Sequence, residues 1–471
     1  MWEHDVAPTD AEPIPDFVMA PPPAGASQNG QADTAWTWLT TAEDVWPPAP
    51  ETVEQTGLPV SLLYELVLKI IHFSGPSTTE TLCQRIGLPF TIVEGLLQDL
   101  KREQLLEVVG TSRLNELGFR YRLSTRGEQR AMDALSRSRY ASVAPVTLEQ
   151  YAPVVRRQSL RQTPPSPGRI LQALNELVLS PRTVDNLARA LHSGRTTLIF
   201  GASGNGKTAI LEHYARYTND TIIVPHALYV HGQLIRIFDA AVHQPVEPEL
   251  QPVDDFGLFK PQSRVNRLDR RWIQVRRPVV IVGGELTQES LELSFDPVAH
   301  FYQAPPHLKA QDGMFVIDDF GRQRVRPEEL LNRWILPMER GFDLLTLHTG
   351  ESFSVPFEMA LMFSTNLRPE DLVDEAFLRR IPYKVHIPGP TREELCEITR
   401  RVAASRRLAC TPEQIERFVD MLCADPAREP KGVYPRDLIQ IIFDIARFEG
   451  SEPALTPEMI ERAMRVYFIA E

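Results

Sequence analysis

The stretch that decides the fold is TTLIFGASGNGKTAILEHYARY, residues 196–217. An apolar, β-branched run leads into a glycine-rich loop, and a segment with helical spacing follows. The loop matches GxxxxGK[ST] in the strand–loop–helix setting that this motif requires, and it consists of Gly201, Ala202, Ser203, Gly204, Asn205, Gly206, Lys207 and Thr208. The glycines let backbone N–H groups surround a phosphate chain at the helix N-terminus. The sequence therefore predicts a nucleotide-binding site, with Lys207 on the β- and γ-phosphates and Thr208 on Mg²⁺.

Length and composition indicate a multidomain cytoplasmic protein. At 471 residues the chain is too long for one compact core, so two to four domains are expected. No apolar run reaches the roughly 20 residues that span a membrane, and the N-terminus lacks the pattern of a secretory signal, so no membrane insertion is expected. Four scattered cysteines without a CxxC pair indicate reduced thiols rather than a metal or disulfide framework.

The net charge of −12 lies mostly in residues 1–55, which hold ten Asp or Glu and no Lys or Arg. Because this segment is also rich in proline and has no lasting period, we expect a disordered tail. Within it, residues 33–46 (DTAWTWLTTAEDVW) hold three of the six tryptophans. They form either a docking segment, for a partner or for the protein's own body, or a tail with chance aromatics. The rest of the chain is nearly balanced, so its acidity does not exclude nucleic acid as a partner.

Residues 56–140 carry the patterns of three helices, two strands and a closing helix. The first helix, SLLYELVLKIIHFSG, ends at Gly75, and a capped start at Ser77 opens the second. The third is FTIVEGLLQDLKREQ, with its apolar residues on one face. LLEVVG and FRYRLS then form strands around a loop, before the helix TRGEQRAMDALSRS. This order resembles the winged-helix domain of bacterial regulators.

The charges of this domain leave its partner open between DNA and protein. Residues 101–140 hold nine Lys or Arg against five acids, which favours contact with phosphates. Three arginines fall on the expected wing: Arg113, Arg120 and Arg122. The third helix would enter the major groove of DNA, yet it presents Glu94 and Asp99, which phosphates would repel.

The remaining chain alternates strands and helices after a proline-rich linker, residues 141–168. Over residues 169–388 this alternation predicts a parallel sheet with crossover helices. The patterns of residues 389–471 are helical and indicate a lid.

Three further motifs place polar groups where strands or helices of this region end. MFVIDDFGRQ, residues 314–323, ends its strand in Asp318, which would hold Mg²⁺ through water, and Asp319, which would polarise the attacking water. ALMFSTNLRPEDL ends its strand at Asn366, whose amide can help to orient that water. DEAFLRRIPYKV puts Arg379 and Arg380 at a helix end, just before another strand.

In this order and spacing the motifs resemble those of the AAA+ ATPases. The resemblance covers residues 169–471 and implies an α/β fold, a P-loop AAA+ three-layer parallel sheet with a C-terminal helical lid. In the lid, VYPRDLIQII is similar to the second sensor of the family, which would be Arg436. The resemblance also implies ATP and Mg²⁺ as cofactors and a homo-oligomeric ring, commonly a hexamer. Arg380, with Arg379 as a second candidate, would reach the neighbouring subunit's γ-phosphate as an arginine finger.

A helix and a hairpin between the acidic motif and Asn366 indicate a subgroup. The hairpin, FDLLTLHTGESFSVPF, looks like the one before the sensor strand in MoxR-like ATPases and McrB-like proteins, and Arg322 sits like the arginine of their DE-x-N-R pattern. The chain is also similar to predicted ATPases with chaperone activity linked to Flp pilus assembly. It lacks the GAFTGA loop of enhancer-binding activators, and its hairpin turn offers no Lys or Arg, so activator and helicase functions are disfavoured.

Two stretches lie outside these motifs. RVNRLDRRWIQVRR, residues 264–277, holds six arginines and one acid, and forms either a solvated basic face or a contact for a subunit or a polyanion. PVVIVGGELT ends a strand in two glycines and Glu285, which is either an exposed turn residue or a functional carboxylate.

Two functions are compatible with the sequence. The first is a Mg²⁺-dependent ATPase that remodels or assembles a protein client, and the second is an ATP-gated switch that binds DNA through residues 56–140. Most relatives carry glutamate in place of Asp319, and aspartate is shorter by roughly 1 Å, a difference that can cost about 10²-fold in rate. We therefore expect slow, assembly-dependent hydrolysis with Asp319 as the base and Glu285 as its possible substitute.

Overall fold

The structure is a computed structural model, and it describes residues 45–111, 119–217, 221–246, 268–372, 374–426 and 428–468. The expected disordered tail lies outside the described residues, apart from residues 45–55. Among the helices that are described, none is both long and apolar enough to cross a membrane.

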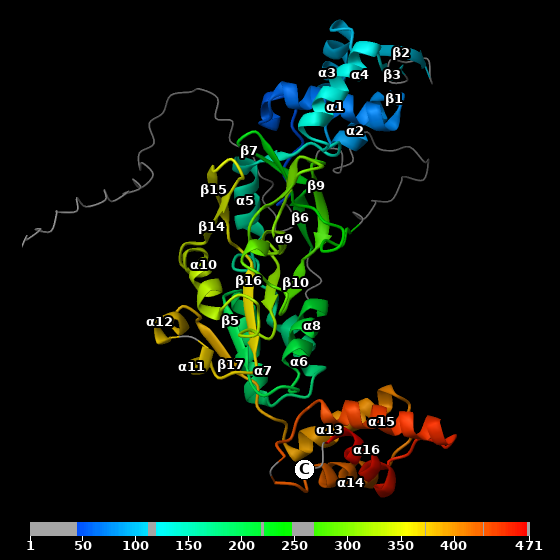
Figure 1. Ribbon diagram of the computed structural model, residues 1–471, viewed down its shortest axis with the longest axis vertical. Coiled ribbons are helices and arrows are strands. Elements are labelled where there is room, and N and C mark those ends of the chain that lie inside the picture. Colours follow the sequence, from blue (N-terminus) through cyan, green and yellow to red (C-terminus); the bar gives the residue numbers. More distant parts are fainter. Residues whose placement is uncertain are drawn as a thin grey trace, which may run out of the picture. The chain divides into compact units, whose positions relative to one another are not determined.

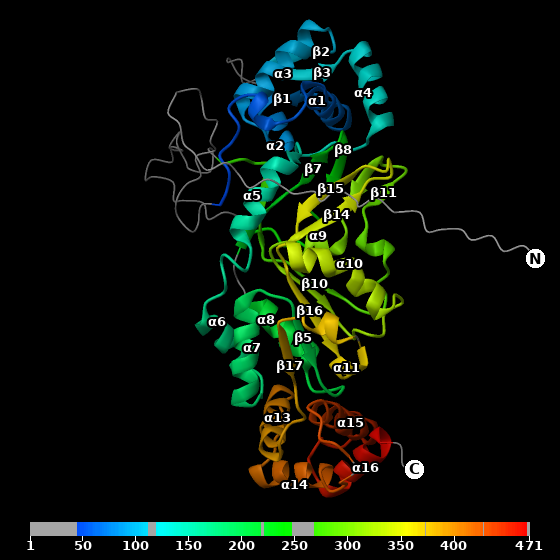
Figure 2. The ribbon, with the colours of Figure 1, turned by 90° about the vertical axis from the view of Figure 1, so that its left-hand side faces the viewer.

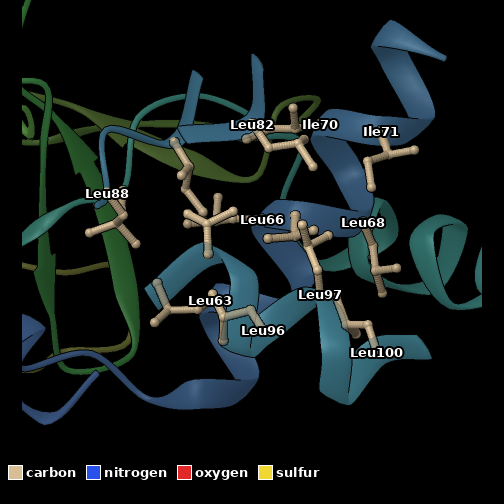
Figure 3. Close-up of a cluster of buried hydrophobic side chains, with 14 of the residues drawn as sticks. Leu63, Leu66, Leu68, Ile70, Ile71, Leu82, Leu88, Leu96, Leu97 and Leu100 are labelled. Carbon is tan, nitrogen blue, oxygen red and sulfur yellow. The ribbon is translucent and has the colours of Figure 1, made fainter. Parts of the chain in front are cut away.

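The first folded part has the predicted helices and the two predicted strands in order, and a short strand between the first two helices joins them. Its elements are η1 (Glu54–Thr56), α1 (Val60–Ser74), β1 (Ser77–Thr78), α2 (Thr79–Ile86), α3 (Phe90–Arg102), β2 (Leu106–Thr111), β3 (Phe119–Leu123) and α4 (Thr125–Arg137). The three strands form an antiparallel sheet with β3 in the middle. Thr78 caps α2 by accepting a hydrogen bond from the backbone N–H of Thr81. Figure 3 shows the buried leucines of this core, among them Leu63 and Leu66 of α1 and Leu97 of α3.

Five parallel strands form the sheet that carries the predicted motifs. In spatial order they are β10 (Val279–Val282), β13 (Met314–Ile317), β16 (Ala360–Thr365), β5 (Thr197–Phe200) and β17 (Tyr383–His386). The glycine-rich loop follows β5, the acidic motif follows β13, and Asn366 follows β16. Because the carboxyl ends of neighbouring parallel strands meet at one edge, this order brings the three motifs together.

Helices cover both faces of this sheet. They are α6 (Pro167–Asn175), α7 (Pro181–Ser193), α8 (Lys207–Tyr217), α9 (Pro306–Lys309), α10 (Pro327–Arg340), α11 (Pro369–Leu372) and α12 (Glu375–Leu378), with η4 (Glu289–Leu291). Alternate residues of β13 face opposite layers: Phe315 packs in the cluster with Trp334 of α10, and Val316 in the cluster with α6, α7 and α8. Figure 2 shows α6, α7 and α8 on one side of the strands and α10 on the other. This three-layer α/β arrangement confirms the predicted fold class.

A β-rich part, built from segments between the elements of the core, departs from the predicted alternation of strands and helices. Its sheet contains, in spatial order, β11 (Ser294–Asp296), β12 (Phe301–Gln303), β8 (Gln233–Arg236), β7 (Ala227–Val230) and β4 (Val146–Thr147). Two strand pairs accompany it: β6 (Thr221–Pro225) with β9 (Trp272–Arg276), and the predicted hairpin β14 (Phe342–Thr346) with β15 (Ser352–Pro356). The chain turns between β7 and β8 because His231 and Gly232 both adopt positive φ, 47° and 77°.

The expected proline-rich linker is partly a helix, α5 (Leu148–Gln158). Its capping box joins Thr147 and Gln150, and Tyr151, Val154 and Val155 are buried against the β-rich part. Proline content alone therefore misassigned this segment, because its apolar residues recur at helical spacing and have a surface to cover.

In the described part of the basic cluster, residues 268–277, two arginines are buried rather than solvated. Arg271 is buried beside Asp269, and its guanidinium also donates to the carbonyl oxygens of Thr56 (3.0 Å) and Pro145 (3.2 Å). Arg277 is buried as well, and donates to the carbonyl oxygen of Gln158 (2.9 Å). These two arginines satisfy buried backbone carbonyls, a role that charge counting along the sequence cannot reveal.

Trp46, the last tryptophan of the aromatic tail segment, lies on the protein's own body. Its Nε1–H donates to the carbonyl oxygen of Asp269 at 2.9 Å. Pro48 forms an isolated β-bridge with Leu268 beside it. Residues 45–48 therefore belong to the folded protein.

The C-terminal residues form the predicted helical part. Its helices are α13 (Arg392–Ser405), α14 (Pro412–Leu422), α15 (Tyr434–Glu449) and α16 (Pro457–Tyr467), which gather into one bundle (Figure 1, orange to red). Phe418, Leu438 and Ile439 are buried at its centre.

Candidate nucleotide-binding site

The glycine-rich loop joins β5 to α8, as predicted. Gly201 has a φ of +151°, and a Cβ there would lie 2.3 Å from the carbonyl oxygen of Ile387, so no side chain fits. Gly204 has a φ of +87°, in the left-handed region. Helix α8 begins at Lys207, so the N–H groups of its first turn have no acceptor within the helix and are available to an anion.

Lys207 is buried at the centre of the site. Its ammonium donates to the carbonyl oxygens of Gly201 (2.9 Å) and Ala202 (3.1 Å) and to Oδ1 of Asn366 (2.6 Å). Burial lowers the pKa of Lys207 from its ordinary value, while the carboxylates of the acidic motif oppose this shift. The ammonium is thus held beside the loop, at the place where the phosphates of a bound nucleotide are expected.

Thr208 and Asp318 form a pair of oxygen ligands. The hydroxyl of Thr208 donates to Oδ2 of Asp318 at 2.7 Å. Hydroxyl and carboxylate oxygens suit Mg²⁺, which keeps several waters and binds proteins through one or two side chains together with substrate phosphates. In the described part of the chain, no group of three or more His, Cys, Asp or Glu could hold a metal by itself. The residues present therefore fit Mg²⁺ bound together with a nucleotide.

Asn366 connects Lys207 to Asp319. Its Nδ2 donates to Oδ1 of Asp319 at 2.8 Å, while its Oδ1 faces the lysine. These two partners settle the orientation of the amide, because an ammonium needs an acceptor and a carboxylate needs a donor. Asp319 is exposed and has a φ of +49°. Aspartate tolerates this left-handed conformation better than most residues do.

The acidic loop is held in place by its own neighbours. Gln323 donates from Nε2 to the carbonyl oxygen of Asp318 (2.8 Å) and accepts from the N–H of Gly321 (2.8 Å). The hydroxyl of Thr365 donates to the carbonyl oxygen of Phe320 at 2.7 Å. Asp318 and Asp319 therefore stand on a loop tied to the end of β16.

A cavity of about 670 Å³ opens over these groups. Its lining includes residues 203–208, Asp318, Asp319 and Asn366. Leu177, Val178 and Leu179 after α6, and Ile398 and Val402 of α13, supply an apolar side. The volume lies within the range of small-molecule sites, and the mixture of apolar walls with a few charged groups is typical of them.

The helical lid completes this cavity. The N–H of Val433 donates to the carbonyl oxygen of Gly204 at 2.9 Å, so the lid touches the glycine-rich loop directly. Arg436, the predicted second sensor, lines the cavity, and its Nε donates to Asp437 (2.9 Å). Arg401 also lines it and donates to the carbonyl oxygen of Glu176 at 2.6 Å. Sequence reasoning missed Arg401, since an arginine in a charged helix is commonly a surface residue.

Comparisons with known proteins found one family model over part of the chain and solved structures of low sequence identity. A family model described as "Domain of unknown function (DUF8689)" matches residues 391–466, which are the lid. No curated protein matches the sequence. Among solved structures, a mutant of RuvB from Thermotoga maritima is 13% identical, with a TM-score of 0.36 over 62% of this chain and 72% of that one. NtrX from Brucella abortus is 13% identical, with a TM-score of 0.36 over 71% of this chain and 60% of that one.

The fold is a three-layer α/β fold with a P-loop at the end of one strand of its parallel sheet. This assignment rests on the chain itself, where the strand order places β5 between β16 and β17 and brings the glycine-rich loop beside the acidic motif and Asn366. The site residues predicted on this basis fall into two groups. Residues 203–208 of the loop, the two aspartates of the acidic motif, Asn366 and Arg436 line one cavity. Gly201 and Ala202 are not among its lining residues, but their carbonyl oxygens accept hydrogen bonds from Lys207.

The other predicted residues lie apart from that cavity. Glu285 follows β10, is exposed, and accepts a hydrogen bond from the N–H of Gly283 at 2.9 Å. That hydrogen bond lowers the pKa of Glu285. Arg379 and Arg380 follow α12, and Arg380 forms an ion pair with Glu339 (2.6 Å). In the part of the chain that the structure describes, these three side chains are not among those that line the cavity.

Proposed function

We propose that this protein is a Mg²⁺-dependent AAA+ ATPase that hydrolyses ATP slowly between the subunits of a ring, expected to be a hexamer, and uses the cycle to remodel or assemble a protein partner. The main support for this proposal is the pair of hydrogen bonds by which Asn366 links Lys207 to Asp319. One amide holds both the cation for the γ-phosphate and the carboxylate for the attacking water.

The predicted site residues that line the cavity each have a role in this proposal. Lys207 binds the β- and γ-phosphates, and Thr208 and Asp318 hold Mg²⁺, which when bound neutralises phosphate charge. Asp319 accepts the proton of the attacking water, while Asn366 positions that water. Arg436 enters from the lid, so that nucleotide binding draws the lid and the glycine-rich loop together.

The place of the arginine pair supports the proposed ring. Arg379 and Arg380 are not among the described residues that line the cavity of their own chain, so in this proposal they act on ATP bound to a neighbouring subunit. An arginine supplied in this way stabilises charge in the transition state of phosphoryl transfer. Hydrolysis should therefore depend on protein concentration.

The decisive experiment separates the two candidate bases. Asp319→Asn should reduce steady-state phosphate release at least tenfold while leaving ATP binding intact, and Glu285→Gln should leave both unchanged. Lys207→Ala, which should abolish ATP binding, is the control for contaminating ATPases. If Asp319→Asn keeps full turnover and Glu285→Gln abolishes it, the assignment of the base is wrong.

A second candidate function is ATP-gated binding of DNA through residues 56–140, proposed here as a winged-helix domain. One observation favours it: Asp99, expected to repel DNA, accepts hydrogen bonds from Tyr64 (3.1 Å) and Arg102 (2.9 Å). Against it, Arg122 of the expected wing pairs with Glu107 at 2.8 Å, and Arg113 lies outside the described residues. Tight, salt-sensitive binding of duplex DNA that changes with ATP would favour this second function.

The client is best sought with a trapped form of the protein. The hairpin β14–β15 is present where the MoxR-like and McrB-like resemblance expects it, and the further likeness to ATPases linked to Flp pilus assembly makes pilus-assembly proteins the first candidates. Asp319→Asn protein held with ATP in the native cell extract should retain the client, and Lys207→Ala protein should not. Stimulation of hydrolysis by that client, but not by duplex DNA, would support remodelling over the switch.

A further inference from the structure

Arg436, which lines the nucleotide cavity from the lid, is paired with its neighbour along the chain. Its Nε donates to Oδ1 of Asp437 at 2.9 Å. A guanidinium carries its other four N–H groups on the two terminal nitrogens, in a rigid plane with Nε. A carboxylate that holds Nε therefore sets the direction in which the terminal N–H groups point.

Asp437 is in turn held by Tyr467 of α16. The hydroxyl of Tyr467 donates to Oδ2 of Asp437 at 3.0 Å, so each carboxylate oxygen has a partner. This second contact matters because 65% of the Arg436 side chain is exposed, and an exposed ion pair alone fixes a side chain poorly. Burial, together with the hydrogen bond to Asp437, raises the pKa of Tyr467 to about 12, so the hydroxyl remains a donor at neutral pH.

An aromatic cluster fixes Tyr467 where α16 ends. Its ring packs edge to face with the rings of Tyr434 and Phe468, at centroid distances of 5.8 and 5.0 Å. The guanidinium of Arg428 lies 3.8 Å from the centroid of the Phe468 ring, which is a cation–π contact. Tyr434 is the first residue of α15, two positions before Arg436. The cluster therefore holds the end of α16 against the start of α15.

The same segment of the lid touches the glycine-rich loop. The N–H of Val433, the residue before α15, donates to the carbonyl oxygen of Gly204 at 2.9 Å. The start of α15 is thus fixed by the loop on one side and by the end of α16 on the other. Asp437 and Tyr467 are not among the described residues that line the cavity, and their hydrogen bonds reach it through Arg436.

We propose that Asp437 and Tyr467 are positioning residues, which direct the terminal N–H groups of Arg436 towards the phosphates of ATP in the cavity. The end of α16, remote from the glycine-rich loop along the chain, thereby sets the affinity of the site for the nucleotide. This inference rests on the proposed ATPase function and adds to it two residues that no sequence motif marks.

The test is a titration of the full chain, with Mg²⁺, against a fluorescent ATP analogue that cannot be hydrolysed. Arg436→Ala should weaken binding roughly ten- to a hundredfold, the order of a charge-assisted hydrogen bond. Tyr467→Phe removes only a hydroxyl, and Asp437→Ala removes the carboxylate. Each should weaken binding about three- to tenfold, because the guanidinium is no longer directed. Asp437→Asn should recover most of the affinity, since its amide can accept from Nε and donate to the Tyr467 oxygen.

The sharpest comparison is made in the Arg436→Ala background. There Tyr467→Phe should have no further effect, because the residue that it positions is gone. If Tyr467 only supported the packing of the lid, its removal would weaken binding equally in both backgrounds. The matched control is Tyr64→Phe, since Tyr64 also donates to a carboxylate, that of Asp99 at 3.1 Å. This variant should bind the analogue as the unmodified chain does, and thermal melts should show every variant folded.

The outcomes are distinct. Unchanged affinity of Tyr467→Phe, or an equal loss in both backgrounds, overturns the positioning role. Tighter binding by Asp437→Ala also overturns it, because Asp437 would then withhold Arg436 from the nucleotide. If Lys207→Ala binds the analogue as well as the unmodified chain does, the proposed function fails, and this inference fails with it. If Lys207→Ala and Arg436→Ala lose binding while Tyr467→Phe does not, the inference alone fails.

Discussion

Restoring glutamate at position 319 tests how the geometry of the acidic loop sets the rate of hydrolysis. In Asp319→Glu the carboxylate gains one carbon–carbon bond of reach, about 1.5 Å. The backbone of Asp319 is held by the surrounding loop contacts, and its carboxylate accepts from Asn366 at 2.8 Å. The longer side chain therefore extends into the cavity rather than shifting the strand.

Two effects of opposite sign follow. A misplacement of about 1 Å can cost roughly 10²-fold in rate, or about 2.7 kcal/mol of transition-state stabilisation, so the variant should hydrolyse ATP ten- to a hundredfold faster. Position 319 has a φ of +49°, which aspartate tolerates better than glutamate. The same variant should therefore lose about 1 kcal/mol of stability.

The assay is phosphate release at saturating ATP and at a protein concentration that supports assembly, with thermal melts in parallel. Asp318→Glu is the matched control, because its longer arm disturbs the pair with Thr208 and should slow the reaction. If Asp319→Glu hydrolyses ATP no faster than the unmodified chain while binding ATP normally, the length of the side chain at position 319 does not limit the rate.

Further predictions concern buried charge and the lid. Burial lowers the pKa of Lys69 to about 8 from 10.5. The unfolded chain therefore binds more protons than the folded one between these values, and stability rises with pH across that window. At pH 7 the free energy of unfolding of Lys69→Met should exceed that of the unmodified chain by up to about 3 kcal/mol. Urea denaturation should show that this difference disappears near pH 10.5. Asp269→Asn leaves buried Arg271 without its countercharge and should cost about 3 kcal/mol in the same assay. In Gly204→Ala the new Cβ would lie 2.7 Å from Val433 of the lid, at a φ of +87°, so a titration with fluorescent ATP analogue should show about tenfold weaker binding.

The core strands and most of the cavity could be predicted because their signals are local. A β-rich run before GxxxxGK[ST], or an apolar run before Asp318, already contains the strand and the group at its end. The helices of residues 60–137 could also be predicted, because capping residues and the spacing of apolar residues mark them.

The β-rich part was missed because its strands are short and pair across long stretches of chain. Strand β4 lies beside β7, and β12 beside β8, although other elements separate them in sequence. The hairpin β14–β15 was predicted from its own residues, and the β7–β8 turn also had a local signal in His231 and Gly232.

By itself the sequence determined the chemistry of the site: which cation, which carboxylates and which amide stand at the ends of strands and at the start of α8. Only the tertiary structure decided their relations, because hydrogen bonds and burial depend on partners far away along the chain. It joined Lys207 to Asp319 through Asn366, buried Arg271 and paired Arg380 with Glu339 while leaving Arg379 exposed. Identical residue types thus acquired different surroundings.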